Sequence, residues 1–425
     1  MRSTITGCGV LAVLAALGLS GAATDDGEIR RLSDNQDAAA GKYSLLNASA
    51  GIAARYPGDE GIEEDSAVVF RETFEEGTIG GLGERWTNIS NKDNRILSFV
   101  SDSVPGSPGK RCLRMTATKG HDTGGHLWKL LEPGYDKLYA RFYVKFAPDA
   151  PYVHHFVHMG AQLNSPPHPM GGAGYRPNGA MSFSTGIDLG NRQEADPPGA
   201  WFFYSYWCEM HSWQTPEGES DGRPNAFYGN PFGPVEPKQA PRDKWQCVEF
   251  MIKCNDPEQR NGEQAFWIDG ELVEHFYPGS HMGTWLRDKF HMTGVFNTDP
   301  QPFEGFRWRT SEYLKINTFW LLYYLASIFE QDIRPEDPEI LYNSEVGQVL
   351  FDDIVLATEY IGPIATGQIG CDFNGDGRAT VADVIQLLFI HRKDPLDMRA
   401  DYNGDGRYAI TDAIALLIDI IAGNC

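Results

Sequence analysis

Two segments near the C-terminus carry oxygen-bearing side chains at matching intervals. One begins at Asp372 and the other at Asp401, and both read D-x-N-x-D-G-x5-D. Side-chain oxygens at positions 1, 3 and 5, a glycine at 6, a backbone carbonyl at 7 and a carboxylate at 12 form the shell that Ca²⁺ prefers. The predicted ligands are Asp372, Asn374, Asp376, Arg378 and Asp383 in the first loop, and Asp401, Asn403, Asp405, Arg407 and Asp412 in the second. Two such loops in one chain predict two bound calcium ions.

The paired loops resemble a dockerin module of the type I pattern. The twelfth residue is Asp in both copies, as in dockerins, whereas an EF-hand usually has Glu there. We expect helices over 381–391 and 411–422. The resemblance implies a calcium-dependent docking module on a secreted carbohydrate-active protein, with a cohesin-like domain as partner. Loop positions 10 and 11 are Val381-Ala382 and Ile410-Thr411 rather than the common Ser-Thr pair. A different partner, or a role as a calcium-stapled cap, therefore stays open.

A second chemical group combines histidines with tyrosines. His154, His155 and His158 are three of the eleven histidines, and Tyr204 and Tyr206 follow on a later segment. If 152–160 is a strand, His154 and His158 share one face and His155 points the other way. The rings of His154 and His158 would then be about 13 Å apart, so this run alone is not expected to bind a metal. For these histidines, the two remaining hypotheses are proton transfer and a purely structural role.

The N-terminus has the pattern of a secretory signal peptide over residues 1–23. Arg2 precedes an apolar run from Gly9 to Leu19, and small residues follow. We therefore expect a protein that is secreted or at the cell surface, and no later run is long and apolar enough to span a bilayer. Six cysteines remain after cleavage, and a disulfide between Cys371 and Cys425 would close the calcium module. The net charge of −22 argues against nucleic acid as a partner.

The remaining chain divides by composition. Residues 24–66 are polar and acidic without periodicity, which predicts a disordered leader. Residues 67–362 hold many short aromatic and β-branched runs separated by Gly, Pro, Asn and Asp, which is typical of an all-β sandwich or barrel. A short linker follows at 363–370, and the loops and helices above make up a small all-α module at 371–425.

Four runs of the β-rich region are distinctive, namely 70–78, 351–358, 245–253 and Phe266-Trp267-Ile268-Asp269-Gly270. With these runs the region resembles a concanavalin-type jelly roll. Similar runs occur in polysaccharide lyases of the alginate and glucuronan type and in laminin-G-like binding modules. In such lyases a strand bearing His or a basic residue is followed by a strand with a Tyr-x-Tyr pair. The resemblance therefore implies Tyr204 or Tyr206 as the proton-transfer group, with His155 or His158 beside it.

Strand periodicity also predicts a binding face. In 139–146 the alternation sends Phe142, Val144 and Phe146 inward and leaves Arg141, Tyr143 and Lys145 on the opposite face. The residues expected to bind substrate in a groove are Arg141, Tyr143, Lys145, Glu249 and Lys253. Cations and aromatic rings suit an acidic sugar. The alternative is a solvated face with weak cross-strand ion pairs.

The resemblance to these lyases implies β-elimination on an acidic, uronate-containing polysaccharide. A base would remove the proton α to the carboxylate, and an acid would protonate the leaving oxygen. Because the pKa of free Tyr is about 10, a tyrosine base needs a nearby cation, for which Arg141, Lys145 or Arg192 is expected. Hydrolysis would need two carboxyl groups about 5 to 10 Å apart, and Glu209 and Glu249 are not obviously paired. The alternative function is a non-catalytic carbohydrate-binding or cell-surface protein of the same fold.

A third calcium ion is expected where the first and last strands of the sandwich meet. Glu75 or Glu76, together with Asp352 or Asp353, would supply hard oxygen ligands there. The alternative is that these acids face solvent.

Overall fold

A computed structural model describes most of the chain. The described residues are 51–164, 167–169, 172–190, 195–326, 344–365, 371, 373–374, 378–393 and 410–422. The predicted signal peptide, the leader up to residue 50 and most of the calcium-loop ligands lie outside these ranges. No helix in the described part is long and apolar enough to cross a membrane.

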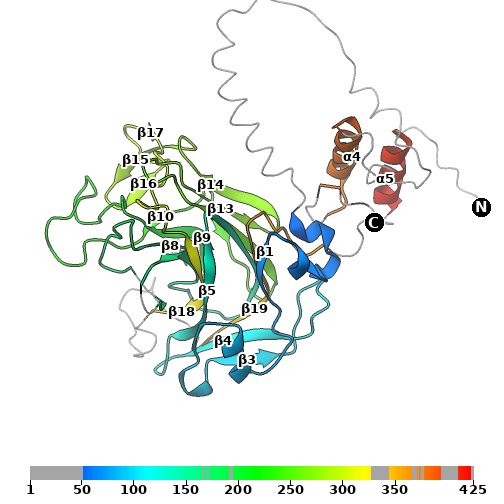
Figure 1. Cartoon of the computed structure of the whole chain (residues 1–425), viewed down its shortest axis with the longest axis horizontal. Helices are drawn as coiled ribbons and strands as arrows, with labels where there is room; N and C mark the ends of the chain where they lie inside the picture. The colour runs from blue at the N-terminus through cyan, green and yellow to red at the C-terminus, as the bar shows by residue number, and fades with distance from the viewer. Residues whose placement is uncertain are drawn as a thin grey trace, which may run out of the picture. The chain divides into compact units, whose positions relative to one another are not determined.

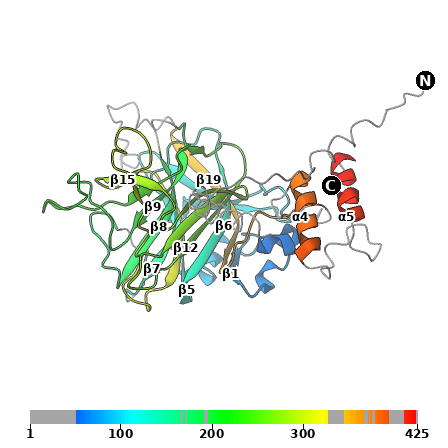
Figure 2. The same ribbon diagram turned by 90° about the horizontal axis from the view of Figure 1, so that it is seen from above.

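Two eight-stranded sheets form a sandwich, with antiparallel pairing throughout both ladders (Figure 1 and Figure 2). The first sheet has the order β14 (Glu271–Phe276), β13 (Glu263–Ile268), β12 (Gln246–Lys253), β6 (Lys137–Phe146), β19 (Val346–Ala357), β4 (Cys112–Thr118) and β3 (Leu97–Val100), with β1 (Val68–Glu72) paired to β19. The second has the order β10 (Asn230–Phe232), β9 (Ala200–Tyr206), β8 (Ser182–Gly190), β7 (Val157–Gln162), β18 (Ile316–Tyr324), β5 (Gly124–Tyr135) and β2 (Asn88–Ser90), with β11 (Lys238–Gln239) paired to β9. The prediction of a mainly β sandwich is confirmed.

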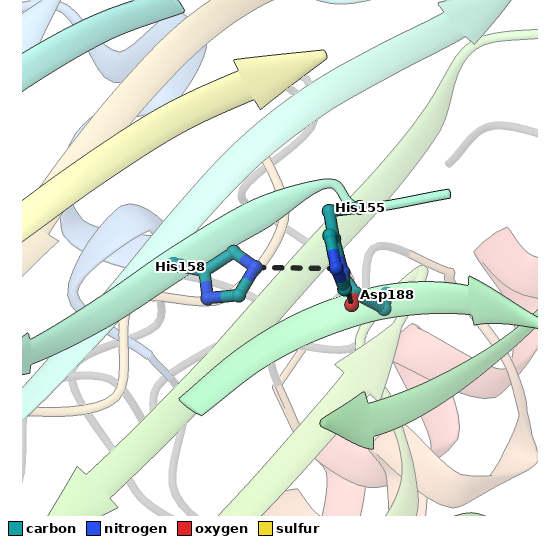
Figure 3. Close-up of side chains that lie close together, drawn as sticks. All are labelled: His155, His158 and Asp188. Carbon is teal, nitrogen blue, oxygen red and sulfur yellow. Dashed lines mark hydrogen bonds and ion pairs between the residues drawn. The ribbon is translucent and has the colours of Figure 1, made fainter. Parts of the chain in front are cut away.

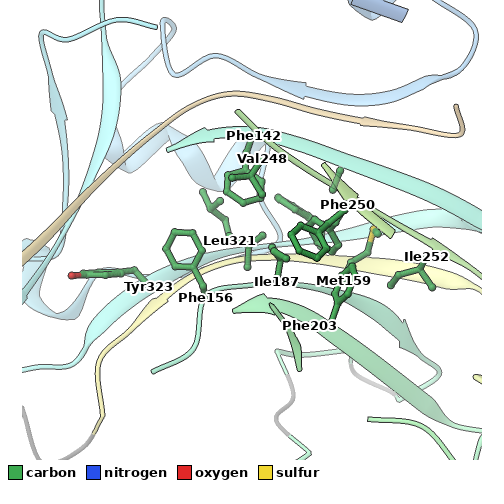
Figure 4. Packing of buried hydrophobic residues seen from close by; sticks show 14 of the residues in the cluster. Phe142, Phe156, Met159, Ile187, Phe203, Val248, Phe250, Ile252, Leu321 and Tyr323 are labelled. Carbon is green, nitrogen blue, oxygen red and sulfur yellow. The ribbon is translucent and has the colours of Figure 1, made fainter. Parts of the chain in front are cut away.

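The core lies between the two sheets and is rich in aromatic rings (Figure 4). Phe142 from the first sheet has its ring centroid 6.2 Å from that of Phe156, and Phe203 from the second lies 5.3 Å from Phe266. Phe142, Val144 and Phe146 are buried as the strand alternation predicted. At one end, β15 (Met282–Leu286), β16 (Lys289–His291) and β17 (Gln301–Pro302) form a small third sheet whose Trp285 ring packs on Phe232.

The segment before β1 is ordered, so the prediction of a disordered leader is wrong for residues 51–66. It forms three short 3-10 turns, η2 (Ile52–Arg55), η3 (Pro57–Asp59) and η4 (Ile62–Glu64). Ile52 and Ile62 are buried in an apolar cluster with Trp267 on the outer face of the first sheet. Ile52, Ala53 and Ile62 lie in a polar stretch and gave no periodic signal, but all three are buried in this cluster.

The C-terminal module contains two helices, α4 (Val381–Lys393) and α5 (Ile410–Ala422), close to the predicted ranges. Val384 and Leu387 of α4 pack in one cluster with Ala413 and Leu416 of α5. Further short helical turns, η5 (Ile79–Glu84) and η6 (Lys92–Asn94), belong to the sandwich. Among the described cysteines, Cys112, Cys208, Cys247 and Cys254 are free thiols. Cys425 lies outside the described residues, so its bond to Cys371 stays a prediction.

Candidate active site

A cleft of about 430 Å³ opens on the face of the second sheet that points away from the core. Strands β9, β8, β7, β18 and β5 form its floor. Its lining residues are Ser90, Lys92, Thr123, Gly124, Gly125, His126, His154, His155, His158, Gly172, Ala173, Ser184, Tyr204, Tyr206, Trp320, Leu322, Tyr323 and Tyr324. The predicted catalytic residues Tyr204, Tyr206, His155 and His158 are therefore brought together in one cavity.

Strand register sets how these side chains face each other. His158 on β7 lies opposite Gly186 on β8, and Gly186 lies opposite Tyr204 on β9. A Cβ on residue 186 would lie only 2.6 Å from His158 Nε2. The glycine thus leaves the space above β8 that the His158 imidazole occupies.

His155 and His158 share the cleft, so the prediction that His155 points away from His158 is wrong. The reason is that β7 begins only at Val157, and His155 precedes it in an irregular segment held by an isolated bridge to Tyr324. Strand alternation does not apply across that boundary. The two imidazole centroids lie 5.9 Å apart.

Asp188 on β8 joins the two histidines (Figure 3). Its Oδ2 lies 2.8 Å from His155 Nδ1, and its Oδ1 lies 3.5 Å from His158 Nε2. The backbone N–H of Phe156 donates to Oδ1 at 2.6 Å. The carboxyl group is fully buried, which alone would raise its pKa, but His155 and His158 outweigh burial and hold that pKa below its usual range. Asp188 is therefore a buried carboxylate that fixes the orientation of His155 and leaves Nε2 as the nitrogen available to a substrate.

The two tyrosines are kept in their neutral form. The Tyr204 ring lies 5.1 Å from that of His155 and 5.6 Å from that of Tyr206. Burial, followed by the neighbouring Tyr206, raises the pKa of Tyr204 far above its usual value, and burial also raises the pKa of Tyr206. Both hydroxyls are consequently proton donors at neutral pH rather than bases.

Aromatic walls complete the cleft. The Tyr324 ring stacks on His155 at 6.0 Å with planes 13° apart, and the Trp320 ring lies 5.9 Å from that of His158. His126 stands edge-on to Trp320, and burial lowers the pKa of its imidazole to about 4. His126 is thus neutral at physiological pH. Flat apolar surfaces of this kind suit the faces of sugar rings.

The predicted substrate-binding residues lie on the first sheet and not in the cleft, so that prediction is wrong. Their side chains contact the segments that cover its outer face or neighbouring strands. Arg141 is completely buried in an ion pair with Asp59. The Tyr143 hydroxyl and the Glu249 carboxylate accept backbone N–H groups of 361–364. Lys145 pairs with Asp102 at 3.2 Å, and Lys253 pairs with Glu263 at 2.8 Å. Neither Arg141 nor Lys145 can supply the cation expected beside Tyr204, and Arg192 lies outside the described residues.

The acids at the junction of β1 and β19 fit a cation. Asp352 and Asp353 are buried, and one carboxylate oxygen of each has no hydrogen-bond partner among the residues that the structure describes. Burial and the adjacent Asp353 raise the pKa of Asp352 to about 9. Glu75 instead accepts the backbone N–H groups of Lys110 and Arg111 at 2.7 and 2.6 Å. Unpartnered hard oxygens in a buried site are the ligands that Ca²⁺ would satisfy.

Only part of the predicted calcium loops is described. Asp383 and Asp412, the twelfth residues of both loops, are buried, and Asp383 accepts the backbone N–H of Asn374 at 3.0 Å. Arg378 is exposed. The other predicted ligands, Asp372, Asp376, Asp401, Asn403, Asp405 and Arg407, lie outside the described residues, so calcium binding stays a prediction.

Sequence reasoning missed Asp188, Gly186, Trp320 and Tyr324. Asp188 is the only acidic residue of β8, and an isolated acid within an apolar strand was the available signal. Trp320 and Tyr324 belong to β18, an apolar strand for which no role was predicted. Gly186 could not be found because its role depends on strand register.

No family model matches the sequence, and no curated protein matches it. Among solved structures, the alginate lyase Aly36B is similar at 14% identity and a TM-score of 0.39, covering 69% of this chain and 98% of its own. A marine PL-14 alginate lyase from Aplysia kurodai is similar at 11% identity and a TM-score of 0.44, covering 69% and 100%. An endo-beta-1,4-glucuronan lyase from the fungus Trichoderma reesei is similar at 18% identity and a TM-score of 0.38, covering 68% and 95%. What the cleft can do chemically therefore has to follow from its own side chains.

Proposed function

We propose that the protein is a polysaccharide lyase that cleaves an acidic, uronate-containing glycan by β-elimination. One observation carries this proposal: a buried carboxylate, Asp188, holds His155 through Nδ1 at 2.8 Å, with Tyr204 beside the same imidazole. An oriented imidazole next to a neutral hydroxyl provides the general base that removes one proton and the general acid that delivers another.

The two residues take complementary roles in this reaction. His155 Nε2 accepts the proton on the carbon α to the uronate carboxylate. The electron pair of that C–H bond forms the new carbon–carbon double bond, and the bond from the β carbon to the glycosidic oxygen breaks. The Tyr204 hydroxyl gives its proton to the departing oxygen. Tyr204 fits the acid role because its raised pKa keeps it protonated, whereas Asp188 stabilises the imidazolium that forms at His155.

Charge on the substrate carboxylate must also be neutralised. Lys92 is the one Lys or Arg among the described residues that line the cleft. We assign Lys92 to this role. Elimination is favoured over hydrolysis because no Asp or Glu occurs among the described lining residues, and hydrolysis needs two carboxyl groups flanking the bond.

The second candidate is a non-catalytic carbohydrate-binding protein. The stacked Tyr324 and His155 rings and the adjacent Trp320 favour it, because such surfaces bind sugars without any chemistry. The two functions differ in their product. Incubation with a panel of uronate polymers tests for the ultraviolet absorbance of an unsaturated uronate. We expect wild-type protein to produce it and His155→Gln to lose it. Binding of a polymer without any such product would establish the second candidate instead.

We also propose that the C-terminal module binds two calcium ions and attaches a secreted enzyme to a partner, with a cohesin-like domain as the first to test. The burial of Asp383 and Asp412 supports the calcium sites, and the loop sequences support the docking role. Pull-down with a cohesin in Ca²⁺ and in chelator tests the partner, since only calcium-dependent capture would agree with the proposal.

A further inference from the structure

We propose that His155, His158 and Asp188 form a binding site for a late divalent transition metal such as Zn²⁺, and that the metal inhibits the enzyme. One ring nitrogen of His155, one ring nitrogen of His158 and one carboxylate oxygen of Asp188 all lie within 4.8 Å of one another (Figure 3). Sequence spacing argued against a metal on the histidine run alone. The third ligand comes from the neighbouring strand β8, where spacing could not reveal it.

The geometry is close to that of a zinc shell. Zinc–ligand distances of about 2.0–2.2 Å place the atoms of a tetrahedral shell about 3.3 Å apart. The contact of His155 Nδ1 with Asp188 Oδ2 measures 2.8 Å, and that of His158 Nε2 with Asp188 Oδ1 measures 3.5 Å. The widest separation in the cluster is at most 4.8 Å, so the ligand atoms would have to approach by up to about 1.5 Å to hold one ion.

The surroundings also suit a metal. His158 Nε2 is buried and has no hydrogen-bond partner in the described part of the chain, although it faces Asp188. A cation would satisfy this nitrogen. The backbone N–H of Phe156 already orients Asp188, as outer contacts do for ligating carboxylates. The remaining coordination position would open toward the cleft that these histidines line.

The ligand set selects the class of metal. Two imidazoles and one carboxylate favour zinc, cobalt, nickel or copper, whereas Ca²⁺ and Mg²⁺ prefer oxygen. The site would therefore not compete with the predicted calcium loops for the same ion. It is built from a sheet and a bridged segment, so its ligands are held in place before a metal arrives.

Inhibition rests on the proposed lyase function and follows from the imidazole tautomer. In the metal-free site the Nδ1–H of His155 donates to Asp188, and Nε2 is the base. A metal on Nδ1 forces the proton onto Nε2, which then has no lone pair to accept a proton from the sugar. Metal binding and elimination would thus exclude each other.

The test uses full-length protein without any affinity tag and with excess Ca²⁺ to fill oxygen-rich sites. Zn²⁺ binding is measured by calorimetry, and Co²⁺ binding by its visible absorption. We expect one equivalent to bind to wild type and to His291→Gln, a control on the half-buried β16 histidine outside the cleft. His155→Gln and His158→Gln should each bind at least about tenfold more weakly. The His158 side chain is more buried than that of His155. If His158→Gln therefore fails to fold, the binding of metal to His155→Gln decides the test.

Two outcomes would overturn the site: no stoichiometric binding to wild type, or equal binding by the histidine variants. Lyase rates with and without Zn²⁺ test the inhibition, and a rate that is unchanged or increased at saturating Zn²⁺ would refute it. If no uronate polymer is cleaved even without Zn²⁺, the proposed function fails, but the Co²⁺ titration still decides the metal site.

Discussion

Replacing Asp188 with asparagine removes one charge and almost no volume, so it isolates what the buried carboxylate does. Asp188 accepts from His155 Nδ1 at 2.8 Å and from the Phe156 N–H at 2.6 Å. An amide can donate to Nδ1 instead, which would put the imidazole proton on Nε2 and abolish the base. The oxygen that remains can still accept from Phe156, so the local backbone should be retained.

The expected loss can be worked from these contacts. A hydrogen bond to a charged group contributes about 1.5–3 kcal/mol, which corresponds to about one to two powers of ten in rate. The wrong tautomer adds to this loss. General base catalysis as a whole contributes about 10²–10⁴-fold, and we expect Asp188→Asn to lower kcat within that range. KM should change little, because Asp188 is buried and does not touch the sugar.

The assay is the initial rate of unsaturated uronate formation, measured from acid to neutral pH on one uronate polymer. Asp221→Asn is the matched control, because Asp221 pairs with Arg223 at 2.6 Å at an exposed position outside the cleft. Thermal unfolding of both variants shows whether the fold is intact. A folded Asp188→Asn protein whose kcat is within about threefold of wild type would refute the base assignment, since that is under 1 kcal/mol.

Four further perturbations test other parts of the structure. Gly186→Ala puts a Cβ 2.6 Å from His158 Nε2, so we expect destabilisation of about 1–3 kcal/mol in urea unfolding and loss of activity; a silent variant would contradict the packing. Arg141→Met leaves its buried carboxylate partner unpaired, so we expect a loss of about 3–5 kcal/mol in stability, with KM unchanged in the folded fraction; a specific rise in KM would restore Arg141 to substrate binding. Tryptophan fluorescence reports unfolding of the sandwich alone, because all ten tryptophans lie within it. Removing Ca²⁺ should lower the Tm measured in this way, and Asp352→Asn should make that decrease smaller. A decrease that is the same in the variant and in wild type would exclude the calcium site at the junction of β1 and β19. Burial alone would raise the pKa of the Glu263 carboxyl group, but His275 and Lys253 outweigh burial and lower that pKa from 4.5 to about 2. The contribution of this group to stability is therefore present above about pH 4.5 and is lost as the pH falls toward 2. Over that range of pH, the Tm of Glu263→Gln should fall less than the Tm of wild type.

Strand patterns were sufficient to predict the sandwich and its core. The alternation around Phe142 and Val144 identified the face of β6 that packs in the core between the two sheets, because that face of a sandwich strand is commonly apolar. The same alternation could not say what covers the opposite face. Arg141 lies on that opposite face and was therefore predicted to bind substrate in a groove, whereas η3 and the segment after β19 bury it.

The candidate site was predicted in its residue types but not in its geometry. His155, His158, Tyr204 and Tyr206 were expected together, and the structure places them around one cleft. Asp188 was not predicted as a site residue, because the role of a single acid depends on the strands that pair with its own. His155 was assigned to the wrong face because the start of β7 determines where alternation begins. Register and strand ends depend on tertiary packing, and a single sequence specifies them poorly.

The most direct test of the proposed function is the chemical nature of the cleaved end. Wild-type protein and His155→Gln are incubated with uronate polymers, and the new chain ends are identified by NMR. β-Elimination by His155 and Tyr204 predicts an unsaturated uronate at every new non-reducing end with wild type, and none with the variant. New reducing ends without unsaturation would mean hydrolysis, and intact polymers throughout would mean that the cleft only binds; either result would contradict the lyase assignment.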